Sequence, residues 1–135
     1  MANKKRVLLV DDDVDFLAIN KGALEAAGFA VECAIDGNAG LQLAKEQALD
    51  AAVLDIIMRT PDEGLELARK LRREPRTQKL PIVMLTSINT VYESRGHLFR
   101  LSDQDRDDLW LPVDRFIDKP VKPEALVAVV RELTA

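Results

Sequence analysis

Four short apolar segments, each followed directly by a residue with a reactive or charged side chain, constrain the fold of this chain more than any other feature. They are residues 7–10, 51–54, 82–85 and 116–117. Stretches with the apolar spacing of amphipathic helices recur between them. Short apolar strands that alternate with helices are typical of a parallel sheet covered on both faces. The sequence therefore predicts a doubly wound α/β fold.

The boundaries of the expected elements follow from turn and capping residues. One helix begins at Val14, with Asp13 or Asp12 as its cap, and stops at Gly28. The last helix opens with Pro123 in its first turn. The remaining pattern predicts strands at 6–10, 29–34, 51–55, 80–85 and 115–118, and helices through Leu41, Ala44 and Ala48 and over 63–73.

The stretch between the fourth and fifth strands interrupts this alternation. Residues 88–112 are polar and acidic, and a connection of this length in a compact domain is unusual. Residues 91–101 within it could form a short helix, which would bring the total to about five helices. We expect residues 91–112, including Phe99, Trp110 and Leu111, to form a specialised partner surface, with a flexible acidic insertion as the alternative.

Size and composition narrow the class of protein. A chain of 135 residues, of which 47% are hydrophobic, is expected to form a single domain over 1–135, without an output domain. The net charge of −4 argues against a nucleic-acid-binding face. No apolar stretch reaches the roughly 18 residues of a membrane span. Cys33 is the only cysteine, so no internal disulfide can form, and a reducing, cytoplasmic location is expected.

The residues that follow the strands predict a site for phosphate chemistry. Asp11, Asp12 and Asp55 would meet at the carboxyl ends of their strands, where ligands bind in open parallel sheets. A like-charge pair 4 Å apart costs about 4 kcal/mol at an effective dielectric constant of 20. A hard divalent cation, with Mg²⁺ as the expected ion, would remove that cost. Lys119 would then offset phosphoryl charge, and Thr86 would supply a hydroxyl donor.

This ordered set resembles the receiver domain of bacterial two-component response regulators. The matching residues are the acidic pair Asp11-Asp12, Asp55 with Met58 and Gly64 downstream, Thr86-Ser87, and Lys119-Pro120. Each motif is weak by itself, whereas four motifs in this order at strand ends are specific. The resemblance covers nearly the whole chain and implies a flavodoxin-like sheet with strand order 2-1-3-4-5.

The resemblance also assigns roles to these residues. It implies that Asp55 is the phosphoacceptor for a phosphohistidine of a sensor kinase. Asp12 and Asp55 would bind Mg²⁺ directly, Asp11 mainly through water, and Ile57 through its backbone carbonyl. Lys119 would pair with the phosphoryl group, and the Lys119-Pro120 bond is cis in the family.

The family's conformational switch would involve the fourth and fifth strands. Thr86 and Phe116 occupy the positions whose hydroxyl and aromatic ring move together on phosphorylation. The signal would pass through the surface formed by the last two strands and the helices beside them, either to a downstream protein or along a phosphorelay. Dimerisation through the last helices is left open.

The chain departs from the family pattern near the phosphoacceptor. Met58 is followed by Arg59-Thr60-Pro61 instead of directly by proline, with one extra residue before Gly64. The loop shape is therefore not assumed. Ile57 cannot orient a hydrolytic water by hydrogen bonding, so a long-lived phosphoryl group is expected.

Two other functions remain as alternatives. Asp11-Asp12-Asp13-Val14 also fits the first motif of haloacid-dehalogenase-like phosphatases, in which Asp11 would be the nucleophile. However, Asp55 then lies between the first two motifs of that family, no acidic pair follows Lys119, and no cap is available to exclude water. The other alternative is a pseudo-receiver that binds partners without phosphorylation, against which the complete set of acids, Thr86 and Lys119 argues.

Overall fold

Five parallel strands form the centre of the computed structural model, which describes residues 4–56, 58, 63–86 and 113–135. The strand order is β2-β1-β3-β4-β5, as the resemblance implied. The strands are β1 (Arg6–Val10), β2 (Ala30–Ala34), β3 (Ala51–Asp55), β4 (Ile82–Thr86) and β5 (Arg115–Asp118). All four neighbouring pairs are parallel, so the carboxyl ends of the strands lie at one edge of the sheet.

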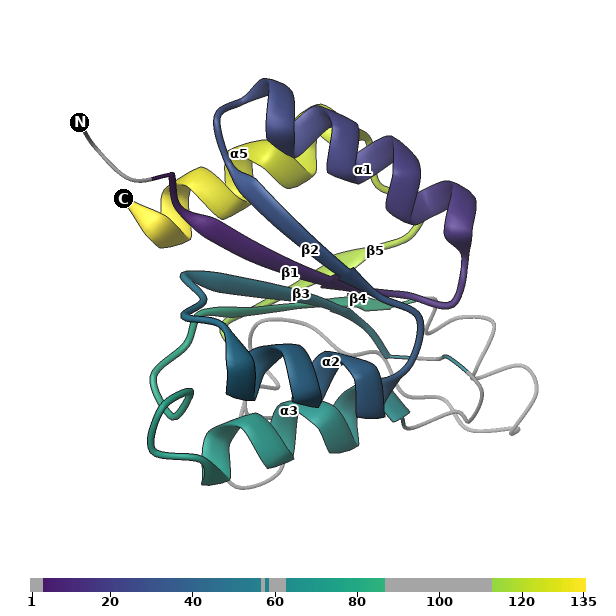
Figure 1. Ribbon diagram of the computed structural model, residues 1–135. Helices are drawn as coiled ribbons and strands as arrows, with labels where there is room; N and C mark the ends of the chain where they lie inside the picture. Colours follow the sequence, from purple (N-terminus) through teal and green to yellow (C-terminus); the bar gives the residue numbers. More distant parts are fainter. Residues whose placement is uncertain (1–3, 57, 59–62, 87–112) are drawn as a thin grey trace.

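The described helices cover both faces of the sheet (Figure 1). Helices α1 (Val14–Ala26) and α5 (Pro123–Thr134) pack on one face, and α2 (Gly37–Glu46) and α3 (Glu63–Arg73) on the other. Alternate residues of each strand therefore enter two separate cores: in β1, Val7 and Leu9 face α1 and α5, whereas Leu8 and Val10 face α2 and α3. Burial on both faces explains why the three central strands, β1, β3 and β4, are almost continuously apolar.

The ends of α1 follow the capping residues read from the sequence. The Asp13 carboxylate accepts hydrogen bonds from the backbone N–H groups of Asp15 and Phe16, and Asp13 is the N-cap. At the other end Gly28 has φ +100°, a left-handed conformation that glycine adopts at little cost. Phe29 N–H donates to the Leu24 carbonyl across this turn. The turn therefore delays the start of β2 to Ala30, one residue later than predicted.

Three further boundaries differ from the predictions. β4 begins at Ile82 instead of Leu80, because Leu80 N–H bonds to the Thr77 carbonyl in a turn and Pro81 has no N–H to donate. β4 also includes Thr86, which was expected after the strand. Helix α2 ends at Glu46 and does not reach Ala48.

Other predictions have different outcomes. The described residues contain four helices, and the fifth, expected over 91–101, lies outside them together with the rest of 88–112. Cys33 is half-buried, and its side chain packs against the core beneath α1 and α5. None of the described helices has the length and apolar character that crossing a membrane requires.

Candidate phosphoacceptor site

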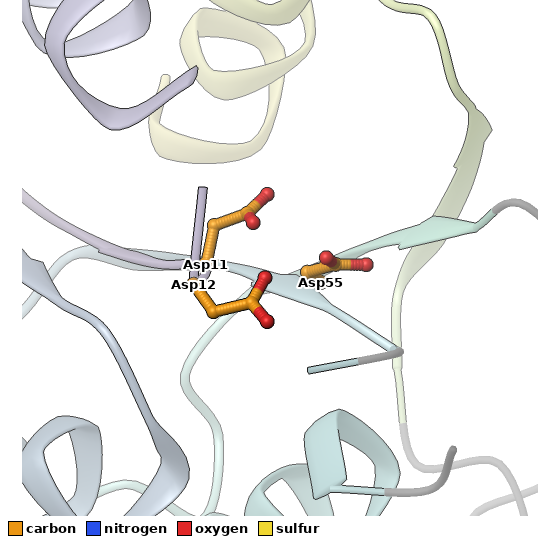
Figure 2. Close-up of side chains that lie close together, drawn as sticks. All are labelled: Asp11, Asp12 and Asp55. Carbon is orange, nitrogen blue, oxygen red and sulfur yellow. The ribbon is translucent and has the colours of Figure 1, made fainter. Parts of the chain in front are cut away.

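Three carboxylates meet at the carboxyl edge of the sheet, where β1 and β3 end side by side. Asp11 and Asp12 follow β1, and Asp55 is the last residue of β3. One carboxylate oxygen from each lies within 4.8 Å of those of the other two. Figure 2 shows the three side chains gathered in one small region. The convergence predicted for these acids is therefore confirmed.

Asp11 is the most enclosed of the three acids. Its side chain is 1% exposed, and its backbone N–H donates to the Ala34 carbonyl, which extends the pairing of β1 with β2. Oδ1 accepts the Asp13 N–H at 2.9 Å, and Oδ2 accepts Lys119 Nζ at 2.8 Å. Both oxygens are thus already engaged. This arrangement suits a fixed, charge-compensated acid and does not favour Asp11 as a phosphatase nucleophile.

Lys119 joins the two buried acids. Its ammonium donates to Asp11 Oδ2 and, at 3.2 Å, to Asp55 Oδ2. Burial would lower the pKa of Lys119, but the hydrogen bonds and negative charges of Asp11 and Asp55 outweigh it, so the pKa is raised above its ordinary value of 10.5. The lysine therefore stays protonated and charged. The predicted cis bond between Lys119 and Pro120 is present.

The ring of Phe16 also contacts the lysine, a feature that the sequence interpretation missed. Lys119 Nζ lies 4.6 Å from the ring centroid, within the range of a cation–π interaction. Phe16 belongs to the first turn of α1, three residues after its cap Asp13. The sequence signal for this contact was an aromatic residue in the first helical turn after the acids that follow β1.

The donor set fits a hard divalent cation. Three carboxylates and one ammonium leave a formal charge of −2, which one such ion would neutralise. All the offered ligand atoms are carboxylate oxygens, the ligands that Mg²⁺ prefers. Asp12 is exposed, so a cation can reach the cluster from solvent and keep part of its water shell. The residues present are therefore compatible with Mg²⁺.

Gly64 allows α3 to begin directly against the end of β3, at Asp55. A Cβ atom at Gly64 would lie 2.0 Å from the carbonyl oxygen of Asp55 and 2.7 Å from the Ile56 Cα. The Gly64 N–H also donates to the Ile56 carbonyl at 3.1 Å. The absence of a side chain at Gly64 therefore lets the helix fix the backbone on which Asp55 stands.

Thr86 and Phe116 occupy adjoining strands on the α2–α3 side of the sheet. Phe116 is partly buried and packs against the core beneath α3, in register with Met84. Thr86 is 0% exposed, and its Oγ1 donates to Asp118 Oδ1 at 3.1 Å. The sequence interpretation treated Asp118 only as a strand end, although its position directly before Lys119 was a signal of its place at the site.

Several predicted site features lie outside the described residues. They are Ile57 with its backbone carbonyl, the Arg59-Thr60-Pro61 departure, Ser87, and the partner surface expected over 91–112. Their roles stay predictions. Among the described candidates, Asp11, Asp12, Asp55 and Lys119 come together, whereas Thr86 bonds to Asp118.

A family comparison agrees with this fold and site. Residues 7–131 match the model of the response regulator receiver domain. The chain belongs to this family.

Individual relatives place the match in context. The chain is 33% identical over 131 residues to the DNA-binding dual master transcriptional regulator RpaA of Synechocystis, covering 95% of this chain and 48% of that protein. It is 36% identical over 128 residues to the response regulator MprA of Mycolicibacterium vanbaalenii, covering 95% and 49%. The chain thus spans about half the length of these curated relatives.

A solved structure shows the same architecture. The chemotaxis response regulator CheY4 of Vibrio cholerae superposes with a TM-score of 0.76 at 26% identity, covering 97% of this chain and 99% of that one. The similarity therefore extends over the entire sheet and its helices.

Proposed function

We propose that this receiver accepts a phosphoryl group on Asp55 from the phosphohistidine of a sensor kinase, and so switches a partner-binding surface. The observation that carries the proposal is the position of Lys119, whose ammonium bonds to both Asp11 and Asp55 beside the third acid. A lysine ammonium that bonds to two carboxylates can also pair with the negative charge of a phosphoryl group that is transferred to one of them. A purely structural turn would not need this arrangement.

The chemical step is a displacement at phosphorus. An oxygen of the Asp55 carboxylate attacks, the new P–O bond forms as the P–N bond of phosphohistidine breaks, and the electron pair of that bond returns to the imidazole nitrogen. The imidazole leaves as a neutral group when its other ring nitrogen carries a proton. The product on this chain is an acyl phosphate. The chain acts as a signalling phosphoacceptor that promotes its own phosphorylation and dephosphorylation, and not as an enzyme that turns over a separate substrate.

The acids would hold Mg²⁺ during the transfer. Asp12 and Asp55 would bind it directly and Asp11 mainly through water, with the Ile57 carbonyl as a further ligand. Bound Mg²⁺ would supply positive charge that offsets the charge developing on the transferred group. Asp11 also keeps Lys119 in place through its 2.8 Å hydrogen bond.

Two exposed apolar side chains near the three acids could contact a protein that donates the phosphoryl group. Val14 opens α1 next to the acids and is 64% exposed, and Ile35 follows β2 and is 55% exposed. Ile35 directly follows the end of a strand at the same edge of the sheet as the acids, Val14 begins the helix beside them, and a docked protein would cover both. We infer that the kinase docks here.

The output would leave through the other side of the site. Thr86 would donate its hydroxyl to the phosphoryl group, and Phe116 would follow it, changing the surface near β4, β5 and α5 for a downstream protein or phosphotransfer partner. Nucleic acid is not among the proposed partners of this acidic chain.

Intact-mass spectrometry after incubation with acetyl phosphate and Mg²⁺ tests the proposal. The native protein should gain the mass of one phosphoryl group, and Asp55→Asn should gain none. Asp50→Asn is the matched control, because Asp50 is an exposed acid at the opposite end of β3, where it accepts the Arg6 N–H. A chelator should prevent the gain in the native protein and in Asp50→Asn.

The alternatives predict other results. Labelling that survives Asp55→Asn but is lost in Asp11→Asn would indicate the phosphatase mechanism. A native protein that takes no phosphoryl group under any of these conditions would be a phosphorylation-independent binding module, and the proposal would be wrong.

A further inference from the structure

The hydroxyl of Thr86 already has an acceptor before any phosphoryl group arrives. Thr86 and Asp118 are register partners across the parallel pair β4–β5, so their side chains leave the sheet on the same face. Thr86 Oγ1 donates to Asp118 Oδ1 at 3.1 Å. The strand pairing continues directly beside this contact, where Lys119 N–H donates to the Thr86 carbonyl at 2.8 Å. The two strand ends are thus joined by one backbone and one side-chain hydrogen bond.

A single proton makes this contact exclusive. A threonine hydroxyl has one O–H donor, so a hydroxyl that donates to Asp118 cannot at the same time donate to a phosphoryl oxygen on Asp55. Thr86 is fully buried, and a buried hydroxyl needs a partner. Two acceptors therefore compete for it: the Asp118 carboxylate in the resting protein and the phosphoryl group in the phosphorylated one.

The setting of Asp118 makes the contact easy to break. Asp118 is exposed, so water can solvate its carboxylate once the threonine hydroxyl leaves. Its negative charge also disfavours a second negative group close to Thr86. Asp118 is therefore suited to holding the resting state without locking it.

We propose that Asp118 is a positioning residue that holds Thr86 in its resting orientation and thereby sets the threshold for the phosphorylation switch. This inference rests on the proposed function of Asp55 and Thr86. The affinity of a ligand falls by the fraction of protein that is in the competent state. Removing Asp118 should raise that fraction and tighten binding of a phosphoryl group at Asp55.

Calorimetric titration with beryllofluoride, a phosphoryl mimic, in the presence of Mg²⁺ gives the first measurement. Asp118→Ala should tighten binding by about three- to tenfold relative to the native protein. In a Thr86→Ala background the same substitution should change affinity by much less, because no hydroxyl remains to be released. Glu124→Ala is the charge-matched control, since Glu124 is also exposed and lies in the first turn of α5. It should leave affinity unchanged.

The second measurement needs no phosphoryl mimic. Three-bond NMR couplings to the Thr86 Cγ report its χ1 rotamer in the free protein. They should indicate one rotamer in the native chain and averaging in Asp118→Ala.

The outcomes separate the two claims. Equal tightening with and without the Thr86 hydroxyl would reveal a pure charge effect and overturn the positioning role, as would unchanged affinity in Asp118→Ala. If the native protein does not bind beryllofluoride, the proposed function fails instead. The Thr86 couplings then still decide whether Asp118 holds the hydroxyl, and unchanged couplings would overturn that claim as well.

Discussion

Lys119 is central to the charge balance of the site before phosphorylation. Its ammonium compensates two buried carboxylates and stands over the Phe16 ring. Removing one partner of a buried ionic cluster leaves the remaining charge uncompensated, which costs roughly 3–5 kcal/mol when the group is deeply buried. Lys119 keeps some contact with solvent, with its side chain 22% exposed, so the lower end of that range applies.

The raised pKa of Lys119 predicts how stability depends on pH. In the unfolded chain the amine titrates at its ordinary value of 10.5, and in the folded protein it holds its proton to a higher pH. The stabilisation is therefore complete below pH 10.5 and is lost as pH rises through the folded value. In metal-free buffer, Lys119→Met should lower the free energy of unfolding by about 3 kcal/mol near neutral pH.

Urea denaturation from neutral pH to above 10.5 measures this effect. The difference in free energy of unfolding between the native protein and Lys119→Met should stay constant up to about pH 10.5 and then become smaller as the pH rises further. Lys122→Met, which changes an exposed lysine three residues away, should show neither the loss nor the narrowing. A gap that widens as the pH rises would contradict the assignment of charge to this site.

At the scale of elements, the start of α3 is the part of the fold that packs against the backbone of Asp55, the proposed phosphoacceptor. Helix α3 can approach β3 this closely only because Gly64 has no side chain. Glu63, the first residue of α3, also accepts the N–H of Gly37 at 2.7 Å, so the starts of α2 and α3 are tied together. Both contacts therefore act at the start of α3, beside the backbone of Asp55.

Two glycine substitutions separate this packing from helix propensity. Gly64→Ala should destabilise the protein by about 2–3 kcal/mol, because the new Cβ would overlap the backbone at Asp55. Gly22→Ala, inside α1 where nothing lies within 4 Å of the new Cβ, should stabilise by about 0.5–1 kcal/mol.

Urea denaturation gives both free energies, and acetyl phosphate labelling gives the effect on the site. Gly64→Ala should also slow labelling of Asp55, whereas Gly22→Ala should leave it unchanged. If both substitutions shifted stability in the same direction, close packing at Gly64 would not be the controlling feature.

At the scale of the whole molecule, an ion pair between α3 and Asp114 helps to hold the edge strand β5 against the rest of the fold. Arg72, in the last turn of α3, bonds to the Leu80 carbonyl and pairs with the Asp114 carboxylate at 3.0 Å. Asp114 also accepts the Ile82 N–H at 2.8 Å. These contacts connect α3 with the starts of β4 and β5. The position of β5, which Lys119 directly follows, therefore depends on α3.

Replacing this arginine should loosen the edge strand. Arg72→Met should lower stability by about 1–2 kcal/mol, since hydrogen bonds to charged groups are lost but Asp114 keeps access to water. Arg73→Met changes an exposed arginine in the same last turn of α3 and should cost less than about 0.5 kcal/mol. Amide hydrogen exchange in β5 should accelerate in the first variant alone, and equal exchange in both would argue against this connection.

The sequence by itself determined the elements, their order and the identity of the acidic pocket. Apolar periodicity and capping residues such as Asp13 and Gly28 act over a few residues, so they can be read locally. The strand-end positions of Asp11 and Asp55 followed because parallel strands end at a common edge. Errors arose where local hydrogen bonds decided a boundary, as at Leu80 and Pro81.

Only the tertiary structure decided which partners the site residues take. The shared bond of Lys119 to two acids, its contact with Phe16 and the hydrogen bond of Thr86 to Asp118 all join residues that are distant in sequence. They depend on strand register and helix packing, which set side-chain distances to within an ångström, and no local pattern encodes that precision.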